Sequence, residues 1–420
     1  FFFKQKTAYE IKECDWSSDV CSSDLAASSI SNAGDGLALA ATPLLTLSLT
    51  SDTRLIGAVS FASSLPWLVL TLPAGVIIDR IDRRRTMVSV NWLRAVLYAA
   101  LALLAATDSL TIWILIGLMA AIGACEVLFD MTAQALLPAI VRPEQLERAN
   151  GLLYSTEMIC NNFIGLPAGS WLFVIAVGVP FGLNAASFAL SAVLIARITL
   201  SASTAETTAP PRTFRSDLVD GLRWLWSHRF IRLLAIMLGC VNFAGSLGAS
   251  IWVKYAADEL DVTGALYGAL LAVMAIGSIV GGLIGDRIAT KLGRNTILYA
   301  YVVFTIDGLV YWFFPSVAIL ALWMLFMGVA STTWNIVTVS LRQRLIPEDL
   351  FGRVNSVYRF IGTGSIALGS LAGGFIAHSF GLRAPYLTGS ICAGLALLLG
   401  GAKLVRYMVP AVTPAPPSMT

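Results

Sequence analysis

The stretch GVIIDRIDRRR at residues 75–85 determines how the whole chain is interpreted. In this stretch a long apolar run ends in a glycine, an aspartate and a row of arginines. The stretch GLIGDRIATKLGR at residues 282–294 repeats the pattern, and its Asp286 lies 207 positions after Asp79. The spacing indicates that two parts of the chain share one plan.

A second pair of motifs has nearly the same offset. LLPAIVRPEQLERANG at residues 136–151 corresponds to RLIPEDLFGRVNS at residues 344–356, with Pro143 and Pro347 204 positions apart. Two separate motifs in one register predict an internal repeat of two similar halves. Half-repeats with a binding site at their interface near the membrane midplane are a recurring plan of transporters.

The composition places these halves in a membrane. Of the 420 residues, 57% are hydrophobic and 13% are charged, whereas soluble domains contain about 25% charged residues. This excludes a soluble enzyme, a secreted disulfide scaffold, a disordered protein and a nucleic-acid binder. Twelve apolar runs are long enough to span a bilayer as helices; they lie at 27–49, 55–78, 86–106, 111–137, 151–177, 181–198, 230–256, 264–285, 296–314, 317–340, 354–379 and 384–407.

Basic residues are distributed unequally between the two sides of this predicted bundle. The loops after every second span, together with the C-terminus, hold 21 Lys and Arg residues, and the opposite side holds three: Arg54, Lys254 and Arg383. Cytoplasmic loops carry the excess of Lys and Arg. Both termini are therefore predicted to be cytoplasmic.

Five segments are predicted along the chain. Residues 1–25 (FFFKQKTAYEIKECDWSSDVCSSDL) resemble a translated sequencing adapter, and we expect a non-native leader rather than a signal peptide. Residues 26–200 and 230–408 are the two six-helix bundles. Residues 201–229 form a cytoplasmic linker with an amphipathic helix at the membrane interface, and residues 409–420 a disordered tail. Without the leader the net charge is +5 rather than +3.

The twelve spans, the two halves and the G-x-x-x-D-R-x-x-R-R loop resemble the major facilitator superfamily over residues 26–408. SNAGDGLALAATPLL (31–45) and DLVDGLRWLW (217–226) resemble the branch with macrolide exporters and enterobactin-type siderophore exporters. The resemblance implies an all-α fold of two pseudo-symmetric bundles in the bacterial inner membrane. It also implies a secondary transporter, not an enzyme, that works as a monomer by alternating access and uses the proton motive force instead of a cofactor.

In the family that the chain resembles, the loop motif latches the outward-facing state. The matching residues form a gating set in each half, namely Gly75, Asp79, Arg80, Arg83 and Arg84 in the first, and Asp286 and Arg287 in the second. Asp82 stands where the family usually has glycine. The alternative is that these arginines only fix the topology.

Ionisable residues inside the spans indicate functional positions more strongly than the loop motif does. Inserting a charged side chain at the centre of a membrane helix costs about 2.5–3.5 kcal/mol. Asp35 lies in the first span, and Glu126, Asp130 and Gln134 follow one another at four-residue spacing in the fourth, which places them on one helix face. Low-dielectric surroundings disfavour a charged carboxyl, so these groups can carry a proton near neutral pH. We expect them to couple proton entry to substrate export, with a purely structural pair as the alternative.

Arg94 is predicted to neutralise either Asp35 or Asp130. Pseudo-symmetry adds Asn242, which corresponds to Asp35, and Asn335, which corresponds to Asp130, as further cavity residues. Asp307 has no evident partner, and Glu157 is expected near the cytoplasmic end as a partner of the Arg-rich loops.

NNFIGLPAGSW at residues 161–171 resembles the antiporter motif of exporters through Gly165, Pro167 and Gly169, although Ser170 replaces a glycine. If the motif holds, the direction of transport is export; the alternative is ordinary close helix packing. Four aromatic residues are candidates for the cavity wall of a bulky amphiphilic substrate: Trp67, Phe129, Phe163 and Trp334.

The chain has no phosphate-binding G-x-x-x-x-G-K-[ST] motif and no spaced set of metal ligands. We therefore expect no metal, no nucleic acid and no ATP among its partners, which are a small-molecule substrate, protons and the lipid bilayer. The function predicted first is proton-coupled export of a bulky amphiphilic molecule such as a drug. A siderophore exporter or lysophospholipid flippase is the second, and a transport-dead membrane sensor or scaffold is the third.

Overall fold

The computed structural model describes residues 19–78, 81–140, 156–197 and 214–412, which contain helices and no strands. The first half comprises α1 (Asp19–Leu49), α2 (Thr53–Ile78), α3 (Arg83–Ala106), α4 (Ile112–Ile140), the π-helix η3 (Met158–Gly165), α6 (Leu166–Ile175) and α7 (Val179–Arg197). The second half comprises α8 (Phe214–Ser227), α9 (Arg229–Ala249), α10 (Trp252–Leu260), α11 (Gly264–Leu292), the short 3-10 helix η4 (Gly293–Asn295), α12 (Thr296–Phe313), α13 (Val317–Leu345), α14 (Glu348–Phe380) and α15 (Ala384–Val412).

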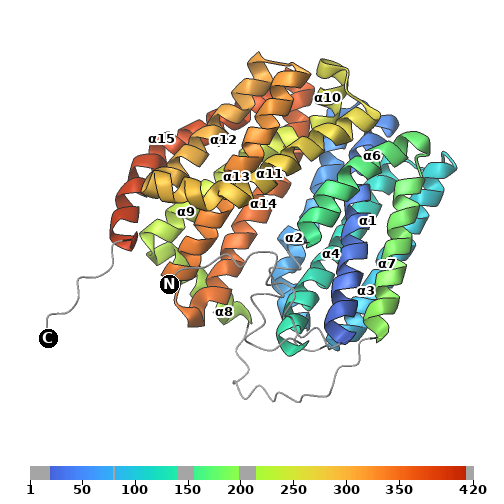
Figure 1. Ribbon diagram of the computed structural model, residues 1–420, viewed down its shortest axis with the longest axis horizontal. Helices are drawn as coiled ribbons and strands as arrows, with labels where there is room; N and C mark the ends of the chain where they lie inside the picture. The colour runs from blue at the N-terminus through green and yellow to red at the C-terminus, as the bar shows by residue number, and fades with distance from the viewer. Residues whose placement is uncertain (1–18, 79–80, 141–155, 198–213, 413–420) are drawn as a thin grey trace.

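Eleven helical segments in the described residues are long and apolar enough to cross a membrane. α1, with 31 residues, lies among them in the first bundle (Figure 1) and supplies the twelfth predicted span. Its polar residues, including Asn32 and Asp35, lower its apolar character. The predicted all-helical fold of two six-helix bundles is therefore confirmed.

Element boundaries differ slightly from the predicted segments. α1 begins at Asp19, within the segment predicted as a leader, and α15 continues to Val412, four residues past the predicted end of the second bundle. A helix, α8, occupies most of the predicted amphipathic stretch. Leu225 of α8 is fully buried, while Val219, Leu222 and Trp226 form an exposed apolar stripe on a neighbouring face, as expected for a helix that lies at a membrane interface.

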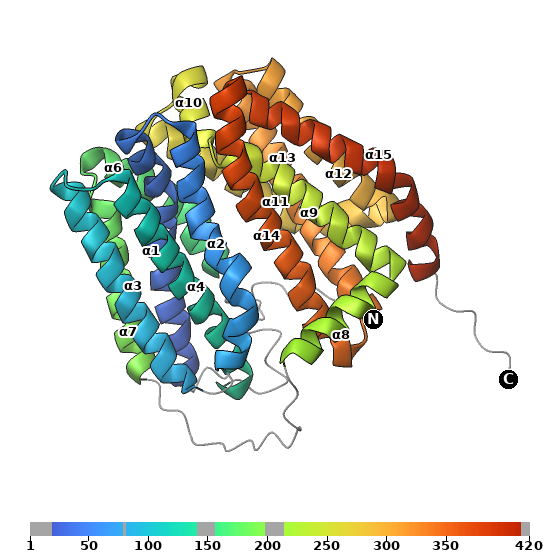
Figure 2. The ribbon, with the colours of Figure 1, turned by 180° about the vertical axis from the view of Figure 1, so that it is seen from behind.

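Each half has its own apolar core, and a third cluster joins them. Leu44 and Ile56 of the first half pack in one cluster with Tyr255, Tyr311 and Tyr386 of the second. Tyr311 and Tyr386 are stacked with ring centroids 4.6 Å apart. This shared cluster lies at the end of the molecule where α10 is found, which we call the α10 end; the opposite end is the α8 end (Figures 1 and 2).

The two halves converge at the α10 end and diverge toward the α8 end (Figure 2). α2 packs against α14, and α6 against α11. At the α10 end Gly57 lies so close to α14 that a Cβ atom on it would be 2.8 Å from the Ser370 carbonyl oxygen. On the other side of the interface, Gly268 of α11 lies so close to α6 that a Cβ atom on it would overlap the side chain of Ser170. Small residues therefore let the helices of the two halves meet at this end.

A second close approach holds α1 against η3 and α6 inside the first half. A Cβ atom on Gly169 would lie 2.3 Å from the Leu37 carbonyl oxygen, and one on Gly165 would lie 2.5 Å from the Cα atom of Gly36. Pro167 lies in the first turn of α6, two residues after the end of the π-helix, and lacks a backbone N–H donor. The residues predicted as an antiporter-like motif thus form a distorted, closely packed helix contact.

We expect Gly169→Ala to lower the free energy of unfolding by about 1–3 kcal/mol, because the added methyl group overpacks the contact with α1. The thermal unfolding midpoint of the purified protein in detergent measures this. Gly117→Ala is the matched control, since nothing lies within 4 Å of a Cβ atom at Gly117. Equal midpoints for the two variants would contradict the close packing at Gly169.

Candidate functional site

A cavity of about 930 Å³ lies between the two halves. Its walls come from α1, α2, α3, α4, η3 and α7 of the first half and from α9, α10 and α14 of the second. Among the residues that the structure describes, the charged ones in its lining all belong to the first half: Asp35, Arg94, Glu126, Asp130 and Glu157. The second half contributes small or apolar residues: Ser246, Ala249, Ser250, Val253, Ile366 and Ser370. The charged groups therefore lie on the wall of the cavity that the first half forms.

Asp35 of α1 and Arg94 of α3 form an ion pair in this cavity, with Nη2 of Arg94 3.3 Å from Oδ1 of Asp35 and 3.4 Å from Oδ2. Arg94 is 4% exposed, and its guanidinium carbon lies 3.9 Å from the centre of the Phe188 ring. The ring and the carboxylate together hold the cation in place. Of the two predicted partners of Arg94, the structure selects Asp35.

Glu126, Asp130 and Gln134 line the cavity from α4, as their four-residue spacing predicts. Within the described part of the chain, neither Glu126 nor Asp130 makes a direct hydrogen bond or ion pair. Gln134 reaches the other half, where its Oε1 accepts a hydrogen bond from Nη1 of Arg359 at 3.4 Å. Two carboxyl groups thus face the cavity without a fixed partner, and either can bind a proton or a cation.

Glu157 also lies on the cavity wall, exposed, one helical step from the lining residue Asn161. Its position in the sequence predicts a place near the cytoplasmic end, as a partner of the Arg-rich loops, and does not predict a place on the cavity wall. The spacing of Glu157 and Asn161 matches that of the α4 stripe and could have indicated a shared face. Four carboxyl groups against one guanidinium give the cavity an excess of negative charge when all are ionised.

The four aromatic candidates divide into two pairs. Trp67 and Phe129 line the cavity. Phe163, which is 41% exposed, does not, because it is two residues along η3 from Asn161 and lies on another side of that helix. Trp334 is 6% exposed and packs against Tyr301 and Phe304 in the core of the second half.

The pseudo-symmetric asparagines lie outside the central cavity. Asn242 and Asn335 line a second chamber of about 490 Å³ within the second half. Nδ2 of Asn242 donates a hydrogen bond to the Gly362 carbonyl oxygen at 3.1 Å. The chain offset correctly located these residues in helices that correspond between the halves, but it could not show that the second half keeps its polar residues in a chamber of its own.

The predicted gating residues are only partly described. Asp79 and Arg80 lie outside the described residues, and Gly75 lies in α2. Arg84 donates to the carbonyl oxygens of Ile195 and Ala196 at the end of α7, where a cation stabilises the negative end of a helix. Asp286 and Arg287 are exposed at the α8 end of α11. The latch therefore stays a prediction.

Asp82, the departure from the family's loop pattern, has a structural role. Its side chain accepts a hydrogen bond from the backbone N–H of Arg85 at 2.9 Å and caps the start of α3. An N-cap carboxylate satisfies a backbone donor that the helix leaves free.

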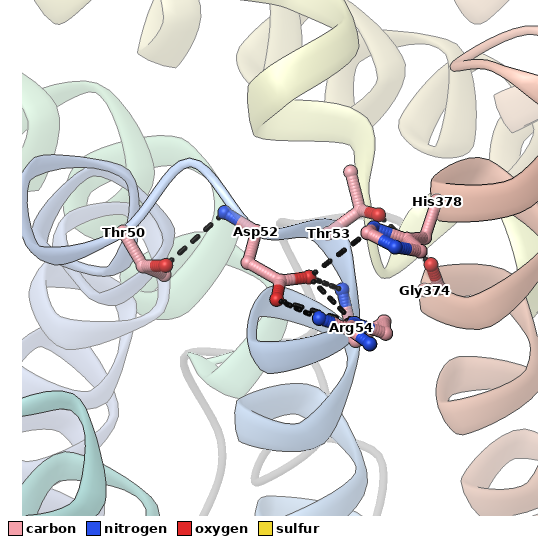
Figure 3. Close-up of polar contacts among 6 residues, drawn as sticks. All are labelled: Thr50, Asp52, Thr53, Arg54, Gly374 and His378. Carbon is pink, nitrogen blue, oxygen red and sulfur yellow. Dashed lines mark hydrogen bonds and ion pairs between the residues drawn. The ribbon is translucent and has the colours of Figure 1, made fainter.

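A polar contact joins the two halves at the α10 end (Figure 3). The hydroxyl of Thr53 donates to the Gly374 carbonyl oxygen at 2.9 Å, and Nδ1 of His378 lies 3.7 Å from Oδ1 of Asp52. Arg54 binds both carboxylate oxygens of Asp52, the nearest at 2.7 Å. The hydrogen bond from Arg54 lowers the pKa of Asp52 below its ordinary value, and the charge of His378 acts in the same direction. No sequence pattern pointed to this contact between the halves.

Comparisons with known proteins agree with this architecture. A family profile described as "transmembrane secretion effector" matches residues 17–417. The multidrug efflux pump Tap of Mycobacterium tuberculosis (strain ATCC 25618 / H37Rv) is 29% identical over 381 residues, which cover 86% of this chain and 89% of the pump. The enterobactin exporter EntS of Escherichia coli O1:K1 / APEC is 22% identical over 389 residues, which cover 89% of this chain and 88% of EntS.

Among solved structures, a bacterial homologue of the iron transporter ferroportin has the same fold. In its inward-facing state the TM-score is 0.69 at 16% identity, and the match covers 94% of this chain and 99% of that one. In its outward-facing state the TM-score is 0.61 at 18% identity, and the match covers 93% of this chain and 99% of that one.

We expect Arg94→Gln to destabilise the protein strongly, because loss of one partner of a buried ion pair costs about 3–5 kcal/mol. The double variant Arg94→Gln with Asp35→Asn should regain part of that stability, since no uncompensated charge stays in the first bundle. Thermal unfolding midpoints of the single and double variants measure the difference. An unfolding midpoint of the double variant no higher than that of Arg94→Gln would show that the pair is not coupled.

The Asp52 carboxylate should stabilise the folded protein in a pH-dependent way. Its folded-state pKa is lowered, so its contribution is complete above the unfolded-state pKa of about 3.9 and is lost as the pH falls through the folded-state value. The midpoint difference between the wild-type protein and Asp52→Asn should be larger at about pH 5 than at about pH 3, where the carboxylate is lost. Asp108→Asn, at an exposed loop position, is measured beside it as the matched substitution away from the contact.

Proposed function

The chain belongs to the transmembrane secretion effector family of the major facilitator transporters, and on this premise we propose that it is a proton-coupled exporter of a bulky amphiphilic small molecule. As a member it is a multi-pass membrane transporter with a small-molecule substrate, and its relatives are transporters rather than enzymes. What we propose beyond this is the coupling to protons, the direction of transport and the class of substrate.

One observation supports the coupling most directly. Glu126 and Asp130 face the central cavity with no direct hydrogen bond or ion pair to any described residue, next to the paired Asp35 and Arg94. A carboxyl group in a low-dielectric, partly wet cavity can exchange a proton at modest cost. A substrate that carries positive or hydrogen-bonding groups then competes with the proton for the same oxygen atoms. This competition exchanges substrate for protons without any further cofactor.

The arrangement of the halves suits alternating access. The close contacts that join them at the α10 end, Thr53 with Gly374 and Gly57 with Ser370, close the cavity there, while the halves diverge toward the α8 end. The excess of Lys and Arg in the loops of the α8 end orients that end toward the cytoplasm. We assign the structure to the inward-facing state of a protein in the bacterial inner membrane, with both termini cytoplasmic and the monomer as the transport unit.

The substrate class is proposed from the wall of the cavity. Trp67 and Phe129 offer apolar surface, and the carboxyl groups of the first half offer hydrogen bonds and charge. A volume of about 930 Å³ is at the large end of the range for small-molecule pockets. The multidrug pump Tap supports a drug-like substrate.

Export of a siderophore is the second candidate, and it rests on the similarity to the enterobactin exporter EntS. The two candidates differ in the charge they present to the cavity, because a siderophore that binds iron through oxygen atoms brings negative charge toward Glu126 and Asp130. A growth test against macrolides and other drugs, run beside a measurement of siderophore release, separates them.

We expect Glu126→Gln to reduce gradient-driven transport at least tenfold, because glutamine keeps the shape of glutamate but cannot release a proton. Everted membrane vesicles that carry an imposed proton gradient measure uptake of a compound that the wild-type protein transports. Exchange of the same compound without a gradient should persist in the variant.

Asp261→Asn is the control for this experiment. Asp261 is exposed in the turn between α10 and α11 with a left-handed backbone (φ 55°), which asparagine tolerates well. Gradient-driven transport by Glu126→Gln at the level of this control would show that Glu126 does not couple the proton.

A further inference from the structure

Three helix ends of the second half meet at the α8 end of the molecule. α8 lies against the ends of α9 and α14 (Figure 2), and α9 begins at Arg229, two residues after α8 ends at Ser227. The last turns of α15 lie beside the first turns of α9, since a Cβ atom on Gly400 would be 3.2 Å from Cδ1 of Leu233. One apolar cluster contains residues of α8, α9 and α15: Trp224, Leu225, Phe230, Leu404 and Tyr407.

α8 is fixed to the second half by close contacts. A Cβ atom on Gly221 would lie 2.7 Å from the Arg353 carbonyl oxygen, so the backbones of α8 and α14 approach closely. Nη1 of Arg232 in α9 donates a hydrogen bond to the Trp226 carbonyl oxygen at 2.6 Å, which ties the last turn of α8 to α9. The face that α8 turns outward is therefore set by its packing on the second half.

That outward face is apolar. Val219, Leu222 and Trp226 are 41%, 44% and 53% exposed, and their spacing of three and four residues places them on one side of the helix. A tryptophan beside aliphatic residues is typical of a helix that lies in the headgroup region of a membrane. The stripe by itself indicates contact with lipid but does not select one lipid over another.

Five basic residues, which we call the basic cluster, gather where the three helices meet. Arg223 lies on α8 with its side chain 78% exposed, and Arg229 and Arg232 lie in the first turn of α9. Lys403 and Arg406 are exposed on the last turns of α15. Residues 221–249 and 384–412 contain no Asp or Glu, so no acid within these segments balances the positive charges.

The acids of the adjoining segments are balanced by other arginines. Oδ1 of Asp220 lies 3.9 Å from Nη1 of Arg223, and Oδ2 of the same carboxylate lies 3.9 Å from Nη1 of Arg353, which is outside the cluster. The three other acids of α8 and of the start of α14 are matched in number by three arginines of α8 and α13: Asp217, Glu348 and Asp349, and Arg215, Arg342 and Arg344. The basic cluster therefore keeps an excess of positive charge.

The apolar stripe and the basic cluster together define the partner that fits. A free phosphate ion would leave Val219, Leu222 and Trp226 uncovered, and a zwitterionic lipid would bring a cation of its own toward the arginines. An anionic phospholipid supplies a negative headgroup and apolar chains in one molecule. Basic residues next to a membrane span or on an amphipathic helix are attracted to anionic headgroups, and this attraction falls off within a Debye length.

We propose that α8 and the adjoining ends of α9 and α15 form a binding site for an anionic phospholipid, whose phosphate pairs with the basic cluster and whose chains cover the apolar stripe of α8. The site goes beyond the proposed transport function, because it requires neither the proton coupling nor the substrate assigned there. It ties the second half to the membrane surface through the helix that follows the linker.

The test is native mass spectrometry of the purified full-length protein in detergent, titrated with phosphatidylglycerol or with phosphatidylcholine of the same acyl chains. We expect the first phosphatidylglycerol to bind the wild-type protein about fivefold or more tightly than the first phosphatidylcholine. Arg229→Gln with Arg406→Gln should bring the two Kd values within about twofold of each other, because it removes two charges that the headgroup meets. Arg229→Lys with Arg406→Lys keeps those charges and should keep the preference.

The matched control is Arg85→Gln with Arg197→Gln, which removes two exposed arginines from adjacent helix ends of the first half and should keep the preference for phosphatidylglycerol. An equal loss in this control would show a general attraction of the α8 end for anions and would overturn the proposal.

Three further results decide against the site. They are a wild-type protein that binds both lipids equally, a glutamine double variant that keeps the full preference, and a lysine double variant that loses it. Displacement of phosphatidylglycerol by an excess of sn-glycerol 3-phosphate would show that the ligand is a free anion and would also overturn the proposal. Glu126→Gln should leave the lipid preference unchanged, so a failure of proton coupling is seen in the vesicle experiment alone and is distinguishable from a failure here.

Discussion

A charge inside a membrane span is tolerated only where it faces protein, water or an opposite charge, and this constraint arranges the first half of the molecule. Asp35 meets Arg94, Arg94 packs on Phe188, and the carboxyl groups of Glu126 and Asp130 turn toward the same cavity. The helices α1, α3 and α4 must therefore present these faces to one another and to the space between the halves. The position of the cavity follows from where these charges can be accommodated.

The two halves share a fold but differ in the polar and charged residues that line their pockets. The first half places its charged side chains in the central cavity, and the second half meets them with serine, alanine and isoleucine. The second half keeps Asp307, Asn242 and Asn335 in a separate chamber behind that wall. A repeat preserves helix order and packing, because these depend on apolar and small residues, while the polar residues that line the pockets differ between the halves.

The two halves are joined at the α10 end by close backbone approaches, polar contacts and an apolar cluster. Gly57, Gly268 and Gly374 bring backbones together without large interlocking side chains, and the polar contacts of Thr53 and Asp52 add few bonds to break. Alternating access in the proposed exporter requires these contacts to separate. The apolar cluster around Tyr311 and Tyr386 also includes Leu44 and Ile56 of the first half, so it is part of the contact between the halves.

The sequence by itself determined the membrane-spanning class, the twelve helices, the repeat and the cavity-facing stripe of α4, since apolar run length and helical period are local properties that survive in any packing of the helices. The tertiary structure alone decided that Arg94 pairs with Asp35, that Glu157 joins the cavity wall, that Asn242, Asn335 and Trp334 belong to a second chamber, and that Asp52 meets His378. These are contacts between helices far apart in the chain. Their choice depends on the rotation and tilt of each helix against its neighbours, which tertiary packing sets.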